Sequence, residues 1–158
     1  MILLLRIVSI VYGLVAILPG YILSRAPNPN LELSDLSPVA QEWFRRGRTY
    51  NVNGYDMFAI VEGDEKSALD TIVLFHGFPT SSFDYHRSLD HLRRAGYRVV
   101  IFDHLGFGFS DKPTDNFVYS MADHAENALD LLRQLGIRRG HVVAHDMGDS
   151  VLTEILAR

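Results

Sequence analysis

The sequence predicts an α/β domain that follows an apolar N-terminal segment. Three apolar runs, 71–75, 98–102 and 141–144, have the continuous hydrophobicity of strands buried on both faces of a sheet. Segments of helical pattern separate them, and the hairpin signal Asn53-Gly54 precedes them. A hairpin followed by alternating strands and helices is typical of an α/β fold whose later strands are parallel, with right-handed crossovers.

Composition limits the class of protein. The 158 residues allow one domain or part of one, and 47% hydrophobic with 22% charged residues excludes disordered, collagen-like and coiled-coil chains. The absence of cysteine excludes disulfide scaffolds, thiolate zinc sites, iron–sulfur clusters and a cysteine nucleophile. Arg6 and Arg25 are the only charges in residues 1–30, so the remainder carries a net charge of −6. This acidic remainder argues against nucleic-acid binding.

The segment Met1–Leu23 is apolar apart from Arg6. As a helix it would be roughly 34 Å long, enough to cross a hydrocarbon core of about 30 Å. We expect a retained membrane anchor, in the endoplasmic reticulum, with the lipid bilayer as its partner. A cleaved signal peptide and a buried core helix are the alternatives; Pro27 after the small-residue site 24–26 disfavours cleavage. Arg6 and Arg25 nearly balance across the segment and leave its orientation open.

The first elements after this segment follow from local signals. Prolines and asparagines in 26–30 indicate a linker, assigned to 24–35, and the domain is assigned to 36–158. Ser37 as N-cap and Pro38 as first helical residue begin a helix that reaches about Arg46. Two β-rich runs, 48–52 and 55–62, flank Asn53-Gly54, and a polar loop, 63–70, follows them.

The later helices lie between the apolar strands. Residues 82–95 form a helix that Gly96 ends, and 120–135 form an amphipathic helix with Ser120 or Asp123 as N-cap. A glycine-rich loop, 106–116, precedes the second of these helices, and a last helix begins at Asp149.

The sharpest chemical signal is Asp146, between the strand 141–144 and the last helix. Small residues, Ala144 and Gly148, lie two positions on either side, as a tight strand–helix turn (a nucleophile elbow) requires. Such a turn holds the central side chain above the sheet edge and lets the next N–H, of Met147, donate to an oxyanion. The alternative is that Asp146 only caps the helix, as Asp149 would also do.

A second loop, His76-Gly77-Phe78-Pro79, follows the first buried strand. In a hydrolase elbow the other oxyanion donor is a backbone N–H in the corresponding loop, and Phe78 stands where it would supply it. We expect His76 to brace the loop rather than act as a base. The alternatives are a plain turn and a buried Phe78 side chain.

Two other site classes are disfavoured. Gly106 and Gly108 suggest a dinucleotide loop, but position 111, where the third glycine belongs, is Asp. His141 and His145 lack the glutamate of a metalloprotease motif, so neither a metal nor a cofactor is predicted.

Three loops, 76–79, 103–110 and 145–148, together resemble the α/β-hydrolase fold in its epoxide hydrolase and haloalkane dehalogenase branch. The resemblance is strongest to the mesoderm-specific transcript family. It is carried by HGFPTSSFDY (76–85), LGFGFSDKP (105–113), HDMGD (145–149) and LSPVAQEW (36–43).

The resemblance implies that Asp146 attacks an electrophilic carbon to form an ester, while the N–H groups of Phe78 and Met147 stabilise the oxyanion when water hydrolyses it. The substrate class implied is a small or lipid-like molecule. Supporting roles fall to His76, Gly77, Pro79, His145 and Gly148. Many members carry Trp after the nucleophile where this chain has Met147, which counts against dehalogenation.

In this fold the chain order is nucleophile, acid, histidine, and no histidine follows Asp146. We therefore expect the N-terminal portion of a hydrolase, inactive alone, with 141–144 as an exposed, aggregation-prone edge. The alternative is a non-catalytic scaffold on the endoplasmic reticulum membrane. A soluble nucleotide-binding protein is disfavoured because phosphate-loop and dinucleotide signatures are absent.

Overall fold

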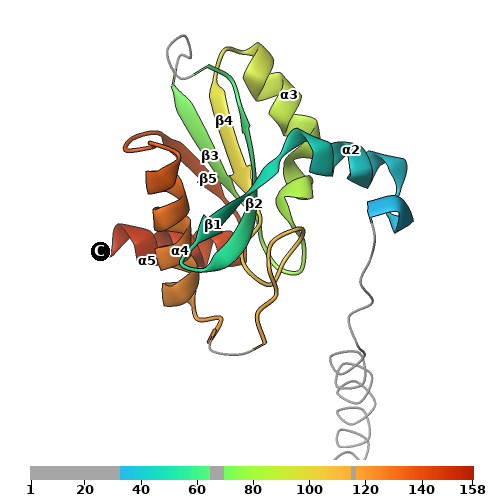
Figure 1. Cartoon of the computed structure of the whole chain (residues 1–158). Helices are drawn as coiled ribbons and strands as arrows, with labels where there is room; N and C mark the ends of the chain where they lie inside the picture. Colours follow the sequence, from blue (N-terminus) through green and yellow to red (C-terminus); the bar gives the residue numbers. More distant parts are fainter. Residues whose placement is uncertain (1–32, 65–69, 115–116) are drawn as a thin grey trace, which may run out of the picture. The chain divides into compact units, whose positions relative to one another are not determined.

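The structure, a computed structural model, describes residues 33–64, 70–114 and 117–158 (Figure 1). The predicted anchor, 1–23, and most of the predicted linker, 24–35, lie outside these ranges. The described end of that linker, Leu33–Asp35, is a 3₁₀ helix, η1. Within the described ranges, no helix combines the length and the apolar character needed to cross a membrane.

Five strands form one sheet in the order β1-β2-β4-β3-β5. The strands are β1 (Arg48–Val52), β2 (Tyr55–Glu62), β3 (Thr71–Phe75), β4 (Arg98–Phe102) and β5 (His141–Ala144). β1 and β2 pair antiparallel across a turn in which Asn53 and Gly54 both have positive φ (53° and 88°), which confirms the hairpin. β2 pairs antiparallel with β4, whereas β4, β3 and β5 are mutually parallel, as predicted.

Helices cover both faces of this sheet (Figure 1). The helices are α2 (Pro38–Arg46), α3 (His86–Arg94), α4 (Met121–Gln134) and α5 (Met147–Leu156). Ser120 caps α4 in a reciprocal capping box with Asp123. Two predicted boundaries were wrong. The first turn of the helix expected at 82–95 is a 3₁₀ helix, η2 (Ser82–Tyr85), and α5 begins at Met147 because Asp146, not Asp149, is its N-cap.

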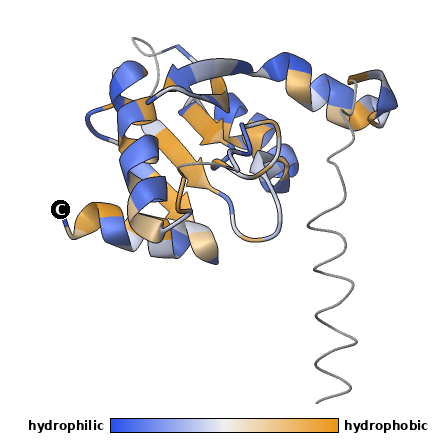
Figure 2. Cartoon of the chain, turned by 60° about the horizontal axis from the view of Figure 1, so that its bottom comes forward, coloured by the Kyte–Doolittle hydropathy of each residue, from blue (hydrophilic) through white to orange (hydrophobic). Residues whose placement is uncertain are grey.

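Alternating strand residues divide the core into two layers. On one face, Val73, Phe75 and Val100 pack with residues of α4 and α5. On the other face, Ile72, Leu74 and Ile101 pack with Trp43 of α2 and Leu89 of α3. Figure 2 shows hydrophobic residues concentrated in the central strands, whereas the helices alternate hydrophilic and hydrophobic residues. This arrangement positions the carboxyl ends of β3, β4 and β5 at one edge of the sheet.

β5 differs from the buried strand that its apolar run suggested. It pairs only with β3 among the described strands and forms the sheet edge. Val142 is 40% exposed and Val143 is 50% exposed. The apolar residues of the run could be buried completely, but the described chain covers them only in part. The expectation of an exposed edge at 141–144 is confirmed.

Candidate active site

Asp146 occupies a tight turn between β5 and α5. Its backbone has φ 54° and ψ −125°, a conformation that a non-glycine residue adopts at a cost of about 1–3 kcal/mol. The side chain is exposed at the carboxyl end of the parallel strands. The turn therefore has the strained geometry and the exposed central side chain expected of a nucleophile elbow.

Two backbone N–H groups converge on one oxygen of this carboxylate. The N–H of Phe78 donates to Asp146 Oδ1 over 2.8 Å, and the N–H of Met147 donates to the same oxygen over 2.6 Å. The two hydrogen bonds, first that of Met147 and then that of Phe78, lower the pKa of Asp146, because both stabilise the ionised form. The site thus holds an ionised carboxylate with Oδ1 occupied and no such contact on Oδ2.

The side chain of Phe78 does not take the buried position that was the alternative. It is 67% exposed. Asp146 does cap α5, because its side chain accepts a hydrogen bond from the N–H of Met147. The helix cap and the elbow are therefore two descriptions of the same turn.

Two glycines allow the loop and the elbow to approach each other. A Cβ atom added to Gly148 would lie 2.6 Å from the carbonyl oxygen of His76 and 2.8 Å from that of Phe75. A Cβ added to Gly77 would lie 2.6 Å from the Cβ of Asp146. The small residues recognised in the sequence are therefore steric requirements of this contact.

His76 braces the loop, as its position suggested. It is fully buried; its Nδ1 lies 3.0 Å from the carbonyl oxygen of Gly77, and its Nε2 accepts from the backbone N–H of His104 over 3.0 Å. Burial is the main cause that lowers its pKa, which favours the neutral ring. Both nitrogens are occupied, so His76 cannot serve as a base here. Pro79 follows a cis peptide bond with Phe78.

His145 and a carboxylate that the sequence analysis did not identify form a pair beside the elbow. His145 Nε2 lies 3.3 Å from Asp84 Oδ2. The Asp84 carboxylate also accepts a hydrogen bond from the hydroxyl of Thr80. The one signal in the sequence was that Asp84 lies within the conspicuous segment 76–85.

Asp103 is a second carboxylate that the sequence analysis missed. It is buried; Oδ1 accepts from the N–H of Ser82 over 2.6 Å, and Oδ2 accepts from the N–H of Phe109 over 2.7 Å. A Cβ on Gly108 would lie 2.1 Å from Asp103 Oδ2, which explains the glycine at that position without a nucleotide. Asp103 thus ties the loop after β4 to the start of η2.

The remaining histidines near the site are buried among aromatic rings. His104 is fully buried, and neither of its ring nitrogens has a hydrogen-bond partner. The ring of His124 lies 5.5 Å from that of His104, and the ring of His76 lies 4.7 Å from it. Across residues 33–64, 70–114 and 117–158, no group of three or more potential ligands is arranged to hold a metal ion.

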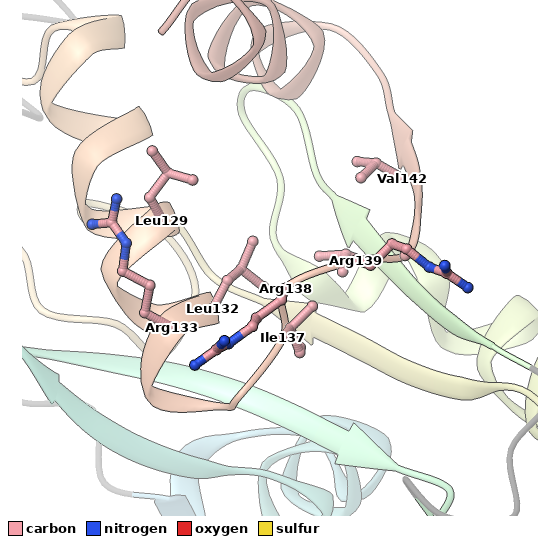
Figure 3. A pocket seen from close by; sticks show the side chains of 9 residues that line it. Leu129, Leu132, Arg133, Ile137, Arg138, Arg139 and Val142 are labelled. Carbon is pink, nitrogen blue, oxygen red and sulfur yellow. The ribbon is translucent and has the colours of Figure 1, made fainter.

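A large cavity lies elsewhere, between α4 and the start of β5 (Figure 3). Its volume is about 580 Å³. Apolar side chains form part of its lining, and three arginines line it as well: Arg133, Arg138 and Arg139. None of its lining residues belongs to the elbow or to the turn at Gly77. We place the candidate active site at Asp146 on chemical grounds, because that is where donors and a carboxylate converge.

Comparison with known proteins agrees with this geometry. The sequence pattern of the alpha/beta hydrolase fold matches residues 70–156. The mesoderm-specific transcript homolog protein of Bos taurus is 38% identical over 125 residues, which cover 78% of this chain and 37% of that protein. Epoxide hydrolase B of Mycobacterium tuberculosis is 31% identical over 104 residues, covering 66% of this chain and 29% of that protein.

Solved structures show the same similarity. The crystal structure of an epoxide hydrolase from Vigna radiata superposes with a TM-score of 0.64 at 27% identity, over 70% of this chain and 35% of that one. The chain therefore spans only about a third of the length of these relatives. The matched residues include all three parallel strands and the Asp146 turn. With its sheet order and its elbow, this chain belongs to the alpha/beta hydrolase fold family.

Proposed function

We propose that Asp146 is the nucleophile of an epoxide hydrolase-like enzyme, of which this chain carries the nucleophile and the oxyanion hole. The observation that carries the proposal is that the N–H groups of Phe78 and Met147 both bind Oδ1. That arrangement leaves Oδ2 available to a reactant at the carboxyl ends of the parallel strands, where Asp146 is exposed. The names of the relatives and structural neighbours support an epoxide as the electrophile.

The proposed reaction has two steps. First, Asp146 Oδ2 attacks an epoxide carbon, the carbon–oxygen bond of the ring breaks, and the ring oxygen takes a proton from solvent. The resulting ester has Oδ1 as its carbonyl oxygen. Second, water attacks the ester carbon and loses its proton, and the charge that develops on Oδ1 is stabilised by Phe78 and Met147 N–H. Cleavage of the bond between Cγ and Oδ2 releases the diol, whose departing oxygen takes the proton of the new hydroxyl group, and restores the carboxylate.

The second step needs a group that takes the proton from water. His76 has both nitrogens occupied, and His104 is buried away from solvent. The Nε2 of His145 faces the Asp84 carboxylate, 3.3 Å away. Absence of a general base slows such a step by about 10²–10⁴-fold. We therefore expect residues 1–158 to form the ester and to accumulate it rather than turn over.

The substrate class follows from the same atoms. The reaction needs a carboxylate, two N–H donors and water, and no cofactor takes part in it. Met147 offers no side-chain N–H to a departing halide, so an epoxide on a small or lipid-like molecule suits the site better than a halide.

The test is to trap the ester. Purified residues 1–158 are incubated with styrene oxide, and intact mass and peptide mapping are measured. We expect one added epoxide mass on the peptide that contains Asp146, removable by hydroxylamine, and no adduct in Asp146→Asn. The matched control is Asp149→Asn, which removes a nearby exposed carboxylate and should leave the adduct unchanged. An adduct that persists in Asp146→Asn, or none in the wild-type chain, would contradict the proposal.

We also propose that residues 1–23 anchor the chain in a bilayer, because their only charge is Arg6. The endoplasmic reticulum is the membrane we expect. After alkaline carbonate extraction, the full chain should stay in the membrane pellet. A variant that lacks residues 1–30 should move to the supernatant. Release of the full chain would reject the anchor.

A further inference from the structure

One carboxylate, Asp84, contacts both segments that form the candidate active site. On the loop side it accepts a hydrogen bond from the Thr80 hydroxyl. The backbone N–H of Thr80 donates to the carbonyl oxygen of Gly77 over 3.1 Å and closes the turn that presents Phe78. On the elbow side, Asp84 Oδ2 lies 3.3 Å from Nε2 of His145, the residue before Asp146.

Close packing at Gly77 and Gly148 sets how near the loop and the elbow can come, and a polar connection can add to this by holding the turn that carries Phe78. The side chains of Phe78 and Asp146 are both exposed, so neither segment is aligned by burying its key residue. The N–H of Met147 is next to Asp146 in the chain and stays close to it in any case. The N–H of Phe78 comes from a different loop, and its hydrogen bond to Oδ1 lasts only while loop and elbow keep their spacing.

The ring of His145 is oriented from a second direction. It contacts the ring of Tyr85 edge-on, with 5.9 Å between centroids. The hydroxyl of Tyr85 donates to the carbonyl oxygen of Phe75 over 2.8 Å, and Phe75 is the last residue of β3. Tyr85 thus contacts one side of the imidazole and is itself bonded to the sheet, and Asp84 Oδ2 faces the Nε2 of the ring.

We infer that Asp84 and His145 are a positioning pair that holds the Phe78 N–H on Asp146 Oδ1. Neither residue touches the reacting atoms in this arrangement; they act through the turn at Gly77–Thr80 and through the elbow. Their effect on the rate of ester hydrolysis rests on the proposed function. Their effect on the Phe78 hydrogen bond does not.

β5 provides a matched control at its other end. His141 Nε2 lies 3.3 Å from Asp70 Oδ2, the same distance as in the positioning pair. His141 begins β5 and Asp70 immediately precedes β3, so this pair also joins the two strands. It lies away from the turn that presents Phe78. If the Phe78 hydrogen bond depended only on a general connection of β5 to β3, breaking either pair would weaken it. If it depends on positioning, only breaking the pair of Asp84 and His145 will weaken it.

The experiment measures amide hydrogen exchange by NMR on residues 1–158 in detergent micelles. In His145→Leu and in Asp84→Ala, the amide of Phe78 should exchange at least about tenfold faster. This is the factor expected when its own hydrogen bond to the Asp146 carboxylate, which is charge-assisted, is lost. The amide of Met147 should change little. His145→Gln, whose amide nitrogen can reach Asp84, should restore most of the protection. His141→Leu should leave the Phe78 amide as in the wild type.

A second readout is the rate at which the Asp146 ester formed with styrene oxide is hydrolysed, which should fall about tenfold in the same two variants, because the Phe78 N–H stabilises the charge on Oδ1 in that step. Unchanged Phe78 exchange in both variants, or an equal effect in His141→Leu, would overturn the inference. If His145→Leu does not fold, Asp84→Ala decides the question by the same amide, because Asp84 is exposed and its loss does not open the core. If wild-type Asp146 forms no ester, the proposed function fails, and the exchange data still decide the positioning pair.

Discussion

Replacing Asp103 by alanine is expected to lower the free energy of unfolding by about 2–6 kcal/mol, because one buried and one partly buried N–H group each lose an acceptor at about 1–3 kcal/mol. The groups are those of Ser82 and Phe109, which donate to the two oxygens of this fully buried carboxylate. A small domain is stable by only about 5–15 kcal/mol, so the variant should be close to unfolding. Urea denaturation followed by circular dichroism measures the change.

The control for this prediction is another carboxylate with a similar bond but without the burial. Asp111 Oδ2 accepts from the N–H of Asp56 over 2.7 Å in an exposed setting. In Asp111→Ala water can replace the lost acceptor, so we expect a loss below about 1 kcal/mol. Equal losses in the two variants would show that Asp103 does not join the loop after β4 to η2 in solution.

The second large effect is acid destabilisation by the buried histidines. Burial is the main cause that lowers the pKa values of His76, His104 and His124. Below a pH of about 6.5 these histidines bind protons in the unfolded chain, whereas in the folded chain they stay neutral. Stability should therefore be constant above that pH and fall as the pH drops below it. At pH 5 the loss should reach up to about 2 kcal/mol for each histidine that stays neutral.

A substitution of His104 tests this loss of stability at low pH most directly. Its ring nitrogens have no hydrogen-bond partner, so His104→Leu removes a titrating group without orphaning a polar neighbour. In unfolding titrations from pH 8 to pH 5, this variant should lose up to about 2 kcal/mol less than the wild type. Phe107→Leu alters the same aromatic cluster without removing a titrating group and should keep the wild-type slope. An unchanged slope in His104→Leu would show that this histidine is charged or exposed in the folded protein.

Local patterns in the sequence were enough to predict the strands and the elbow. The bounds of β3, β4 and β5 agree with the apolar runs, because a strand that crosses a covered sheet has no polar position to interrupt it. The Asp146 turn was predictable because Ala144 and Gly148 satisfy a steric rule that acts over two residues. The hairpin at Asn53-Gly54 has the same local character.

Contacts between distant segments could not be predicted in this way. Asp84 and Asp103 look like ordinary loop carboxylates until the fold brings them to His145 and to the N–H groups of Ser82 and Phe109. The exposure of β5 was predicted from the resemblance to the hydrolase fold and not from its own residues, since its valines are as apolar as those of β4. The tertiary fold decides which residues cover a strand and which donors bind a carboxylate.

The crowding of both N–H groups onto Asp146 Oδ1 makes the two oxygens of one carboxylate unequal. In the proposed reaction Oδ2 leaves with the product and the incoming water replaces it, while Oδ1 stays in its cradle. One oxygen atom of the side chain would then be renewed at every turnover. The other, Oδ1, would remain the oxygen atom that Asp146 carried when the chain was synthesised.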